Sequence, residues 1–392
     1  MLKIAVIARN FPSSAEPWQG RPAYQTLREL ARKADVRVFY PNPGYPSLLK
    51  PRGQSFSKLE PSSDSPDVKV DYYDYPALPV VSRPVNGWMA ARVLLPHIRN
   101  FAPDLIFSYF LYPEGYAALQ VGKALSVPVV ARSMGSDINR IGDPISAMHT
   151  RTVLRKVDFL VMVSRDLREK ALAMGASADR VCTMINGCDT SAFNVRDRSQ
   201  AREKLGIAPD TKAVVYIGRT DVNKGVRELV EAAVSLHPEH PNLHVYLVGG
   251  GPDRAIVQSK IEVNNASGYI HTLPACAFDD VAVWIASADL VTLPSYMEGC
   301  PNVILEALAC GRPVVATNVG GIPEIMSEKF GRLVPPRDPV ALAQALASVL
   351  ADCWDPVAIS AHMGRGWDTV SGELLALFES LVSARKAKTH VH

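Results

Sequence analysis

Two glutamates beside the start of an apolar helix form the segment with the clearest chemical potential. Glu298 lies in a loop after the apolar run 290–293, and Glu306 follows in a stretch whose apolar residues recur at helical spacing. A helix N-terminus offers unpaired backbone amides and a partial positive charge, which suit a phosphate. Carboxylates accept hydrogen bonds from hydroxyl groups, so the pair suits a polyhydroxylated ligand. Two solvated glutamates on an ordinary helix are the alternative, because glutamate is usually exposed.

A second segment places two cations among glycines. Arg219 and Lys224 lie between Gly218 and Gly225, directly after the apolar run 213–217. A guanidinium and an ammonium framed by glycines, which allow a close approach of the backbone, suit a diphosphate. The order of residues differs from that of a Walker P-loop. This segment therefore predicts a phosphate site of another kind.

These segments follow apolar runs that alternate with helical segments, which is typical of parallel sheets covered on both faces. Glycine turns at 249–251 and 320–321 also follow predicted strands. One glycine turn is a weak signal, but their recurrence at strand ends favours a common ligand-binding edge. Ligands of such sheets bind beyond the carboxyl ends of the strands.

The chain of 392 residues is too long for one ordinary core, which favours two domains. The alternation of strands and helices breaks in a polar stretch and then resumes, and we place the boundary there. The sequence predicts an α/β protein with two Rossmann-like domains, 1–195 and 196–370, whose parallel sheets face a central cleft. The amphipathic segment 371–388 is expected to form a helix that stays with the second domain or crosses back to the first.

The amino-acid composition limits the kinds of protein that this chain can be. Apolar residues make up 47% and charged residues 21%, a normal balance for a soluble globular chain. No basic leader with a long apolar core is evident, and no apolar run reaches the roughly 20 residues that span a bilayer. The six cysteines show no C-x-x-C pairing, which favours reduced thiols over a zinc site or disulfides. We therefore expect a cytoplasmic protein.

Charge is distributed unevenly along the chain. Residues 1–195 contain 24 Lys and Arg against 17 Asp and Glu, whereas residues 196–392 contain 18 against 22. A basic first half could face a phosphorylated acceptor or an anionic membrane surface, or could be a merely uneven surface. Nucleic acid is not expected as a partner, because the basic residues are spread out without interleaved aromatic residues.

In combination, these motifs resemble the donor-binding domain of retaining glycosyltransferases of family 4, which have the GT-B fold. The resemblance covers nearly all of 212–350. The first half resembles the acceptor-binding domain more loosely, and its residues 11–20 resemble those of cell-surface polysaccharide transferases. In this fold the C-terminal helix usually crosses back to the first domain. The matching segments are Gly218-Arg219-x4-Lys224-Gly225, the glycines 249–251, the E-x7-E signature from Glu298 to Glu306, 311–316, 320–324, 134–137 and 186–190.

The resemblance implies a site for a nucleotide-diphosphate sugar, with a UDP-sugar as the expected donor. Arg219 and Lys224 would neutralise the diphosphate and stabilise the leaving group, which is usually the largest catalytic contribution. Glu298 is the third residue expected to be catalytic, and it would contact the donor sugar and its phosphate near the reacting carbon. Glu306 would hold the ribose hydroxyls. The other implied donor-binding residues are Gly20, Gly218, Gly250, Gly299, Cys300, Pro301 and Asn302.

The acceptor or sugar side departs from the family pattern. Asp137 is expected on this side, but Met134 stands where many members have His or Arg. His149 could supply the missing imidazole, although a lone histidine is more often structural. Gly20 is followed by Arg21 in place of a second glycine. These departures concern the sugar and the acceptor and leave the diphosphate site unaffected.

The expected function is transfer of a sugar to a hydroxyl acceptor with retention of configuration, in exopolysaccharide, capsule or other cell-envelope glycan synthesis. No Asp-x-Asp occurs in the chain, so no metal or other cofactor is expected. Two alternatives stay open, a GT-B nucleotide-sugar epimerase and a non-catalytic subunit that binds nucleotide-sugar.

The expected acceptor is a glycan or a lipid-linked sugar. One segment could form a basic amphipathic face in peripheral contact with the inner face of an anionic membrane. Its apolar residues are Trp88, Met89, Val93, Leu94 and Ile98, and its basic residues are Arg92 and Arg99. The alternative is that these apolar residues pack on the first sheet.

Overall fold

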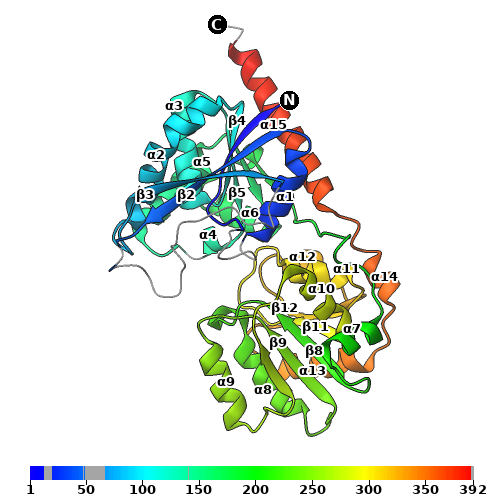
Figure 1. Ribbon diagram of the computed structural model, residues 1–392. Helices are drawn as coiled ribbons and strands as arrows, with labels where there is room; N and C mark the ends of the chain where they lie inside the picture. The colour runs from blue at the N-terminus through cyan, green and yellow to red at the C-terminus, as the bar shows by residue number, and fades with distance from the viewer. Residues whose placement is uncertain (13–19, 47, 49–66, 140, 390–392) are drawn as a thin grey trace. The chain divides into compact units, whose positions relative to one another are not determined.

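The computed structural model describes residues 1–12, 20–46, 48, 67–139 and 141–389, and these form two compact units (Figure 1). Met1–Asn186 and Trp367–His392 make up the first unit, and Gly187–Gly366 make up the second. Each unit is built around one parallel sheet covered by helices, as the alternation of strands and helices predicted.

The first sheet has seven strands in the order β3-β2-β1-β4-β5-β6-β7, and all neighbouring pairs are parallel. Its central strands are almost entirely buried, because both of their faces are covered by helices. Their carboxyl ends lie at one edge of the sheet. The strands are β1 (Lys3–Ile7), β2 (Asp35–Gly44), β3 (Lys69–Pro76), β4 (Leu105–Tyr109), β5 (Val129–Ser133), β6 (Phe159–Met162) and β7 (Val181–Thr183).

Helices α2 and α3 pack together, and α1 packs with α15 on the other side of the first sheet (Figure 1). The helices are α1 (Arg21–Ala31), η2 (Arg83–Val85), α2 (Asn86–Phe101), η3 (Leu111–Gly115), α3 (Tyr116–Leu125), α4 (Ser136–Asn139), α5 (Pro144–Lys156), α6 (Arg165–Ala173), η4 (Ala178–Arg180) and α15 (Trp367–Thr389).

The C-terminal helix α15 is part of the first unit. Phe378 on this helix is fully buried, and its ring lies 5.1 Å from that of Phe107 on β4. Lys33, just after α1, donates to the carbonyl of Asp368 at 3.2 Å. The segment expected as a helix at 371–388 thus crosses back to the first domain.

The second sheet has six strands in the order β10-β9-β8-β11-β12-β13, again with parallel pairing. The strands are β8 (Lys212–Ile217), β9 (Leu243–Val248), β10 (Ile270–Leu273), β11 (Leu290–Leu293), β12 (Val314–Thr317) and β13 (Gly331–Val334). The helices are α7 (Arg198–Leu205), η5 (Val222–Lys224), α8 (Val226–Leu236), α9 (Arg254–Val263), α10 (Phe278–Ser287), α11 (Asn302–Ala309), α12 (Ile322–Ile325), α13 (Pro339–Ala351) and α14 (Pro356–Ser360).

The second unit begins before the boundary expected at 196 and ends before 370. The amide of Cys188 donates to the carbonyl of Arg365 at 3.0 Å, which joins the segment that enters this unit to the segment that leaves it. Phe193 is buried in the second core, 5.2 Å from the ring of Phe278. Apolar burial, which polar composition alone did not reveal, therefore assigns the segment before 196 to the second unit.

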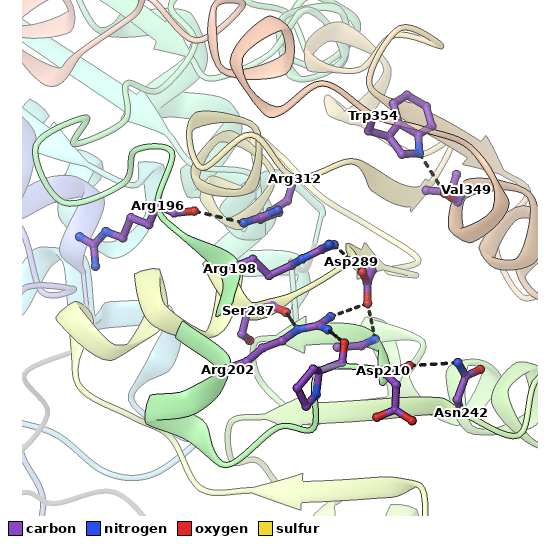
Figure 2. A network of polar contacts seen from close by, with 12 residues as sticks. Arg196, Arg198, Arg202, Asp210, Asn242, Ser287, Asp289, Arg312, Val349 and Trp354 are labelled. Carbon is purple, nitrogen blue, oxygen red and sulfur yellow. Dashed lines mark hydrogen bonds and ion pairs between the residues drawn. The ribbon is translucent and has the colours of Figure 1, made fainter. Parts of the chain in front are cut away.

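Helix α7 is fixed to the second sheet by an arginine–aspartate network (Figure 2). Arg202 is almost fully buried and donates to Asp289 Oδ2 at 2.7 Å and to the carbonyl of Ser287 at 3.0 Å. Asp289 precedes β11 and also accepts the amide of Ala213 on β8 at 2.7 Å. Because this buried carboxylate and guanidinium are both multiply bonded, they hold α7 in one position.

Candidate active site

The loop after β8 is tied to the loop after β11 by backbone contacts. The amide of Tyr296 donates to the carbonyl of Asn223 at 2.8 Å. Gly225 has φ 64°, and a Cβ atom there would lie 1.9 Å from the carbonyl oxygen of Pro294. Only glycine allows this approach, so the sequence brings the two loops together through that residue.

This arrangement joins two of the residues expected to be catalytic. Lys224 Nζ lies 2.6 Å from Glu298 Oε1, and the two side chains are 22% and 11% exposed. An ion pair that is largely shielded from water is held more firmly than a surface pair. The structure therefore places an ammonium and a carboxylate together at the carboxyl end of the second sheet.

Arg219 lies on the same loop as Lys224, and its side chain lies beside Asp221. Its side chain is 72% exposed, and its Nε lies 3.5 Å from Asp221 Oδ2. Its carbonyl accepts the hydroxyl of Tyr216 at 2.6 Å, which fixes the backbone while the guanidinium extends into solvent. A long exposed cation of this kind can turn toward an anionic ligand.

The backbone of Glu298 is held by the glycine pair after β12. Gly320 has φ 52°, and a Cβ atom there would lie 2.0 Å from the carbonyl oxygen of Glu298. The amide of Gly321 donates to the same oxygen at 3.4 Å. Helix α11 begins at Asn302 after Pro301, with no side chain capping its first turn. Gly299 and Cys300 join Glu298 to this helix end, so the predicted segment forms one continuous site.

Glu306 is half-buried on α11, and burial raises the pKa of its carboxyl group to about 7. It lies near the thiols of Cys188 and Cys310, whose pKa values are raised by burial and further by the Glu306 charge. The residue expected to hold ribose hydroxyls thus changes charge near neutral pH, because few groups around it solvate the carboxylate.

The glycines after β9 pack on the loop after β8. A Cβ atom on Gly249 would lie 1.9 Å from the carbonyl oxygen of Gly218, and one on Gly251 would lie 2.2 Å from that of Thr220. The amide of Thr220 donates to the carbonyl of Gly250 at 3.0 Å. A Cβ atom on Gly250 would meet nothing within 4 Å, so the side of the loop on which it lies is open.

In the first unit, Gly20 begins α1 with φ 64°, and a Cβ atom there would lie 2.1 Å from the carbonyl oxygen of Asn10. Asp137 accepts the amides of Leu111 at 2.9 Å and Gly135 at 3.1 Å, and also the Ser133 hydroxyl at 2.8 Å. Burial raises the pKa of Asp137 despite these bonds. Its oxygens are therefore already used to fix two loops at the carboxyl edge.

His149 packs between two tyrosines of the first unit. Its ring is stacked on that of Tyr112 at 5.4 Å and lies 4.2 Å from that of Tyr116. This surrounding is typical of a structural histidine. The structure thus gives no separate support for a role of His149 on the acceptor side.

Sequence reasoning missed a carboxylate at the same edge of the first sheet. Glu114 follows β4 and is 3% exposed, with its Oε1 3.9 Å from the Nε of Arg9, which follows β1. Burial raises the pKa of Glu114, and the Arg9 charge opposes this shift. The available signal was that both residues closely follow apolar runs of strand type, whereas the pairing of β1 with β4 is seen only in the structure.

Among the described residues, no group of three or more His, Cys, Asp or Glu is arranged to hold a metal ion. The expectation that the reaction needs no metal stays a prediction. In that same part of the chain, no helix is long and apolar enough to cross a membrane.

Comparisons with known proteins agree with this geometry. The family model described as glycosyl transferases group 1 matches residues 211–352, and that of the glycosyl transferase 4-like domain matches residues 19–187. The putative teichuronic acid biosynthesis glycosyltransferase TuaC of Bacillus subtilis is 30% identical over 364 residues, which cover 88% of each chain. The chain is a group 1 glycosyltransferase.

A further curated relative and two solved structures are also similar to this chain. A D-inositol 3-phosphate glycosyltransferase of Catenulispora acidiphila is 29% identical to this glycosyltransferase over 303 residues, 70% of this chain and 72% of that protein. Sucrose-phosphate synthase of Thermosynechococcus elongatus has a TM-score of 0.80 at 21% identity, over 98% of this chain and 100% of the other. Alr3699/HepE of Anabaena, solved in complex with UDP, has a TM-score of 0.75 at 18% identity, over 97% and 100%. The GT-B fold expected from the sequence is confirmed.

Proposed function

We propose that this glycosyltransferase moves a hexosyl group from a UDP-sugar to a hydroxyl of a cell-envelope glycan or its lipid-linked precursor, with retention of configuration. The observation that carries the proposal is the Lys224–Glu298 pair, at 2.6 Å, beside an uncapped helix start and an exposed arginine. The envelope role rests on the similarity to a protein named for teichuronic acid biosynthesis. The crystal structure of HepE with UDP supports UDP as the first nucleotide to test.

The proposed chemistry needs charge stabilisation more than a nucleophile. The acceptor oxygen forms a bond to the anomeric carbon on the face from which the diphosphate leaves, and the acceptor proton passes to a phosphate oxygen of the departing UDP. Lys224 exchanges its Glu298 partner for the diphosphate, and Arg219 turns from solvent onto the same charge. Glu298 then accepts hydrogen bonds from the sugar hydroxyls, and Glu306 accepts those of the ribose.

A screen of UDP-, GDP- and ADP-sugars tests this function. We expect UDP release with at least one UDP-sugar, and an NMR spectrum of the product in which the anomeric configuration of the donor is kept. An inverted product would contradict retention. Isomerisation of the donor without transfer would indicate an epimerase.

For the membrane, the structure favours a different surface from the one considered from the sequence. Leu94 and Ile98 on α2 are fully buried in the first unit, so they pack on the sheet. An exposed apolar surface, which we call the apolar corner, lies elsewhere in the first unit. It is formed by η2 with the residues before it, by the start of α2 and by α5. Helix η2 contacts both α2 and α5. The exposed apolar residues of the apolar corner are Leu78, Val80, Val81, Val85, Trp88, Ile145 and Met148.

We propose that this apolar corner rests on an anionic membrane at the inner face of the cell membrane, where a lipid-linked acceptor would be found. Val80 and Val81 are 86% and 75% exposed, and the Arg92 guanidinium lies 5.6 Å above the Trp88 ring. Apolar side chains beside cations match the boundary between acyl chains and anionic headgroups.

Sedimentation with phosphatidylglycerol vesicles tests the apolar corner. We expect binding at low salt that is lost when Val80 and Val81 are both replaced by Asp. Val263→Asp on α9 is the matched control, because this valine is equally exposed in the second unit. Equal binding of the double variant and the control would reject the surface.

A further inference from the structure

The second unit contains a cavity that the proposed transfer does not use. It has a volume of about 660 Å³ and lies over the face of β9 and β10, beside the loop that follows α7. Pro241 and Asn242, which precede β9, line it, so it lies toward the amino ends of the strands. The Lys224–Glu298 pair lies at the carboxyl ends of the sheet. The cavity is therefore separate from the donor site within this unit.

Three aromatic rings, those of His244, Tyr246 and His271, lie together in the lining of the cavity. His244 Nδ1 and His271 Nε2 are 3.0 Å apart, and the two ring planes differ by 10° with their centroids 5.3 Å apart. A hydrogen bond between ring nitrogens in nearly parallel planes means that the imidazoles lie edge to edge. The ring of Tyr246 lies 4.9 Å from that of His271 with the planes at 24°, so these two rings are stacked with an offset. The ring of Trp284 on α10 lies 5.5 Å from that of Tyr246.

The walls of the cavity are fixed before any ligand arrives. Arg202, held by Asp289, donates through Nη1 to the carbonyl of Pro209 at 2.8 Å. From the other side, Asn242 Nδ2 donates to the carbonyl of Asp210 at 3.0 Å (Figure 2). The loop with Asp210 is thus anchored at two points, which lowers the ordering cost of binding.

Charge narrows the class of ligand. Within the described part of the chain, no lysine or arginine lines this cavity, and Asp210 is its acidic group. Burial lowers the pKa of both His244 and His271, so both rings are neutral at neutral pH. Phosphates and acidic sugars would therefore meet no compensating cation.

We propose that this cavity is a carbohydrate-binding site for a neutral pyranose ring, distinct from the donor site. The C–H groups of a pyranose face carry partial positive charge and suit contact with aromatic rings such as those of His244, His271 and Tyr246. The ring hydroxyls donate to Asp210 and reach the amide of Asn242 at the rim. Such a site would retain a glycan chain on the enzyme between transfers.

Histidine-selective NMR tests this site on the full-length protein. Maltotetraose, cellotetraose and chitotetraose are the neutral probes, and tetragalacturonate is the acidic contrast. We expect at least one neutral probe to shift the ring signals of His244 and His271, with no shift from tetragalacturonate. Asp210→Lys, at an exposed position, should weaken this binding about tenfold. His244→Ala should have a similar effect, read from the ring signal of His271.

Two controls separate this site from the rest of the molecule. His240→Ala removes a histidine outside the cavity lining and should leave the affinity unchanged. Lys224→Ala should also leave it unchanged, since that residue belongs to the donor site. No shift with any neutral probe at tens of millimolar, or loss of the shift in Lys224→Ala, would overturn the proposal.

Discussion

The carboxyl edges of the two sheets are built in different ways. In the second unit, glycines bring loops into direct backbone contact and leave charged side chains facing outward, as at Gly225, Gly320 and Arg219. In the first unit, buried carboxylates hold the loops, and Asp137 uses both of its oxygens internally. Close backbone contacts require glycine at particular positions, so they can be recognised as a motif in the sequence. A carboxylate buried against backbone amides has almost no such sequence signature. The predictions below test this difference, from the largest expected effect to the smallest.

Replacing Lys224 with Ala should lower kcat by about 10²–10³-fold, because a cation aimed at the leaving group acts mainly in the transition state. Steady-state kinetics with the donor found by the screen measure this. Lys260→Ala is the matched control, since that lysine pairs with Glu231 on the outer helices of the same unit. Unchanged turnover of Lys224→Ala at saturating donor would remove the residue from the phosphate site.

Two glycine substitutions separate a glycine needed for backbone packing from a glycine expected to lie against the donor. Gly320→Ala should destabilise the second unit by about 2–3 kcal/mol, because its Cβ atom would collide with the Glu298 carbonyl at positive φ. Gly250→Ala meets open space and should leave the melting temperature nearly unchanged. If the donor approaches Gly250 closely, the KM of Gly250→Ala for the donor should nevertheless rise. An unaltered KM would remove Gly250 from the donor site.

Asp137→Asn should cost about 1–3 kcal/mol of stability, because the asparagine amide has one acceptor oxygen in place of two and leaves either the Leu111 amide or the Gly135 amide without its acceptor. Chemical denaturation measures this loss. If Asp137 acts only through the fold, kcat/KM of the folded variant should stay near that of the parent. A large loss of kcat with intact stability would instead place the carboxylate in the reaction.

The affinity for UDP-glucose should depend on pH through Glu306. Its carboxyl group has a pKa of about 7, raised by burial, and ribose hydroxyls donate to the ionised form. The affinity should therefore be highest above pH 7 and decrease below it, because the Glu306 carboxyl group must lose its proton before it can accept the ribose hydroxyls. Well below pH 7 the decrease should approach about tenfold per pH unit. UDP-glucose has no group that titrates in this range. Calorimetry with Glu306→Gln should give a profile without this step.

Much of the site could be predicted because the residues concerned are close in sequence or follow strands directly. Glu298, Gly299 and Glu306 form one segment, and strand alternation placed the Arg219–Lys224 loop at the same edge. Arg9 and Glu114 could not be paired in this way. Their contact depends on β1 and β4 being neighbours in the sheet, although the chain reaches β4 only after two other strands.

The sequence by itself determined the family, the two α/β units and the identity of the donor-loop residues. These could be recognised because glycines and charged residues at fixed spacing show where a loop needs a particular backbone conformation or a particular charge. Only the tertiary structure decided that Lys224 pairs with Glu298, that Glu306 is partly buried, and that Leu94 and Ile98 are core residues. It also placed His244 beside His271 over a cavity. Burial and pairing arise when distant strands and helices pack together, so spacing along the chain cannot encode them.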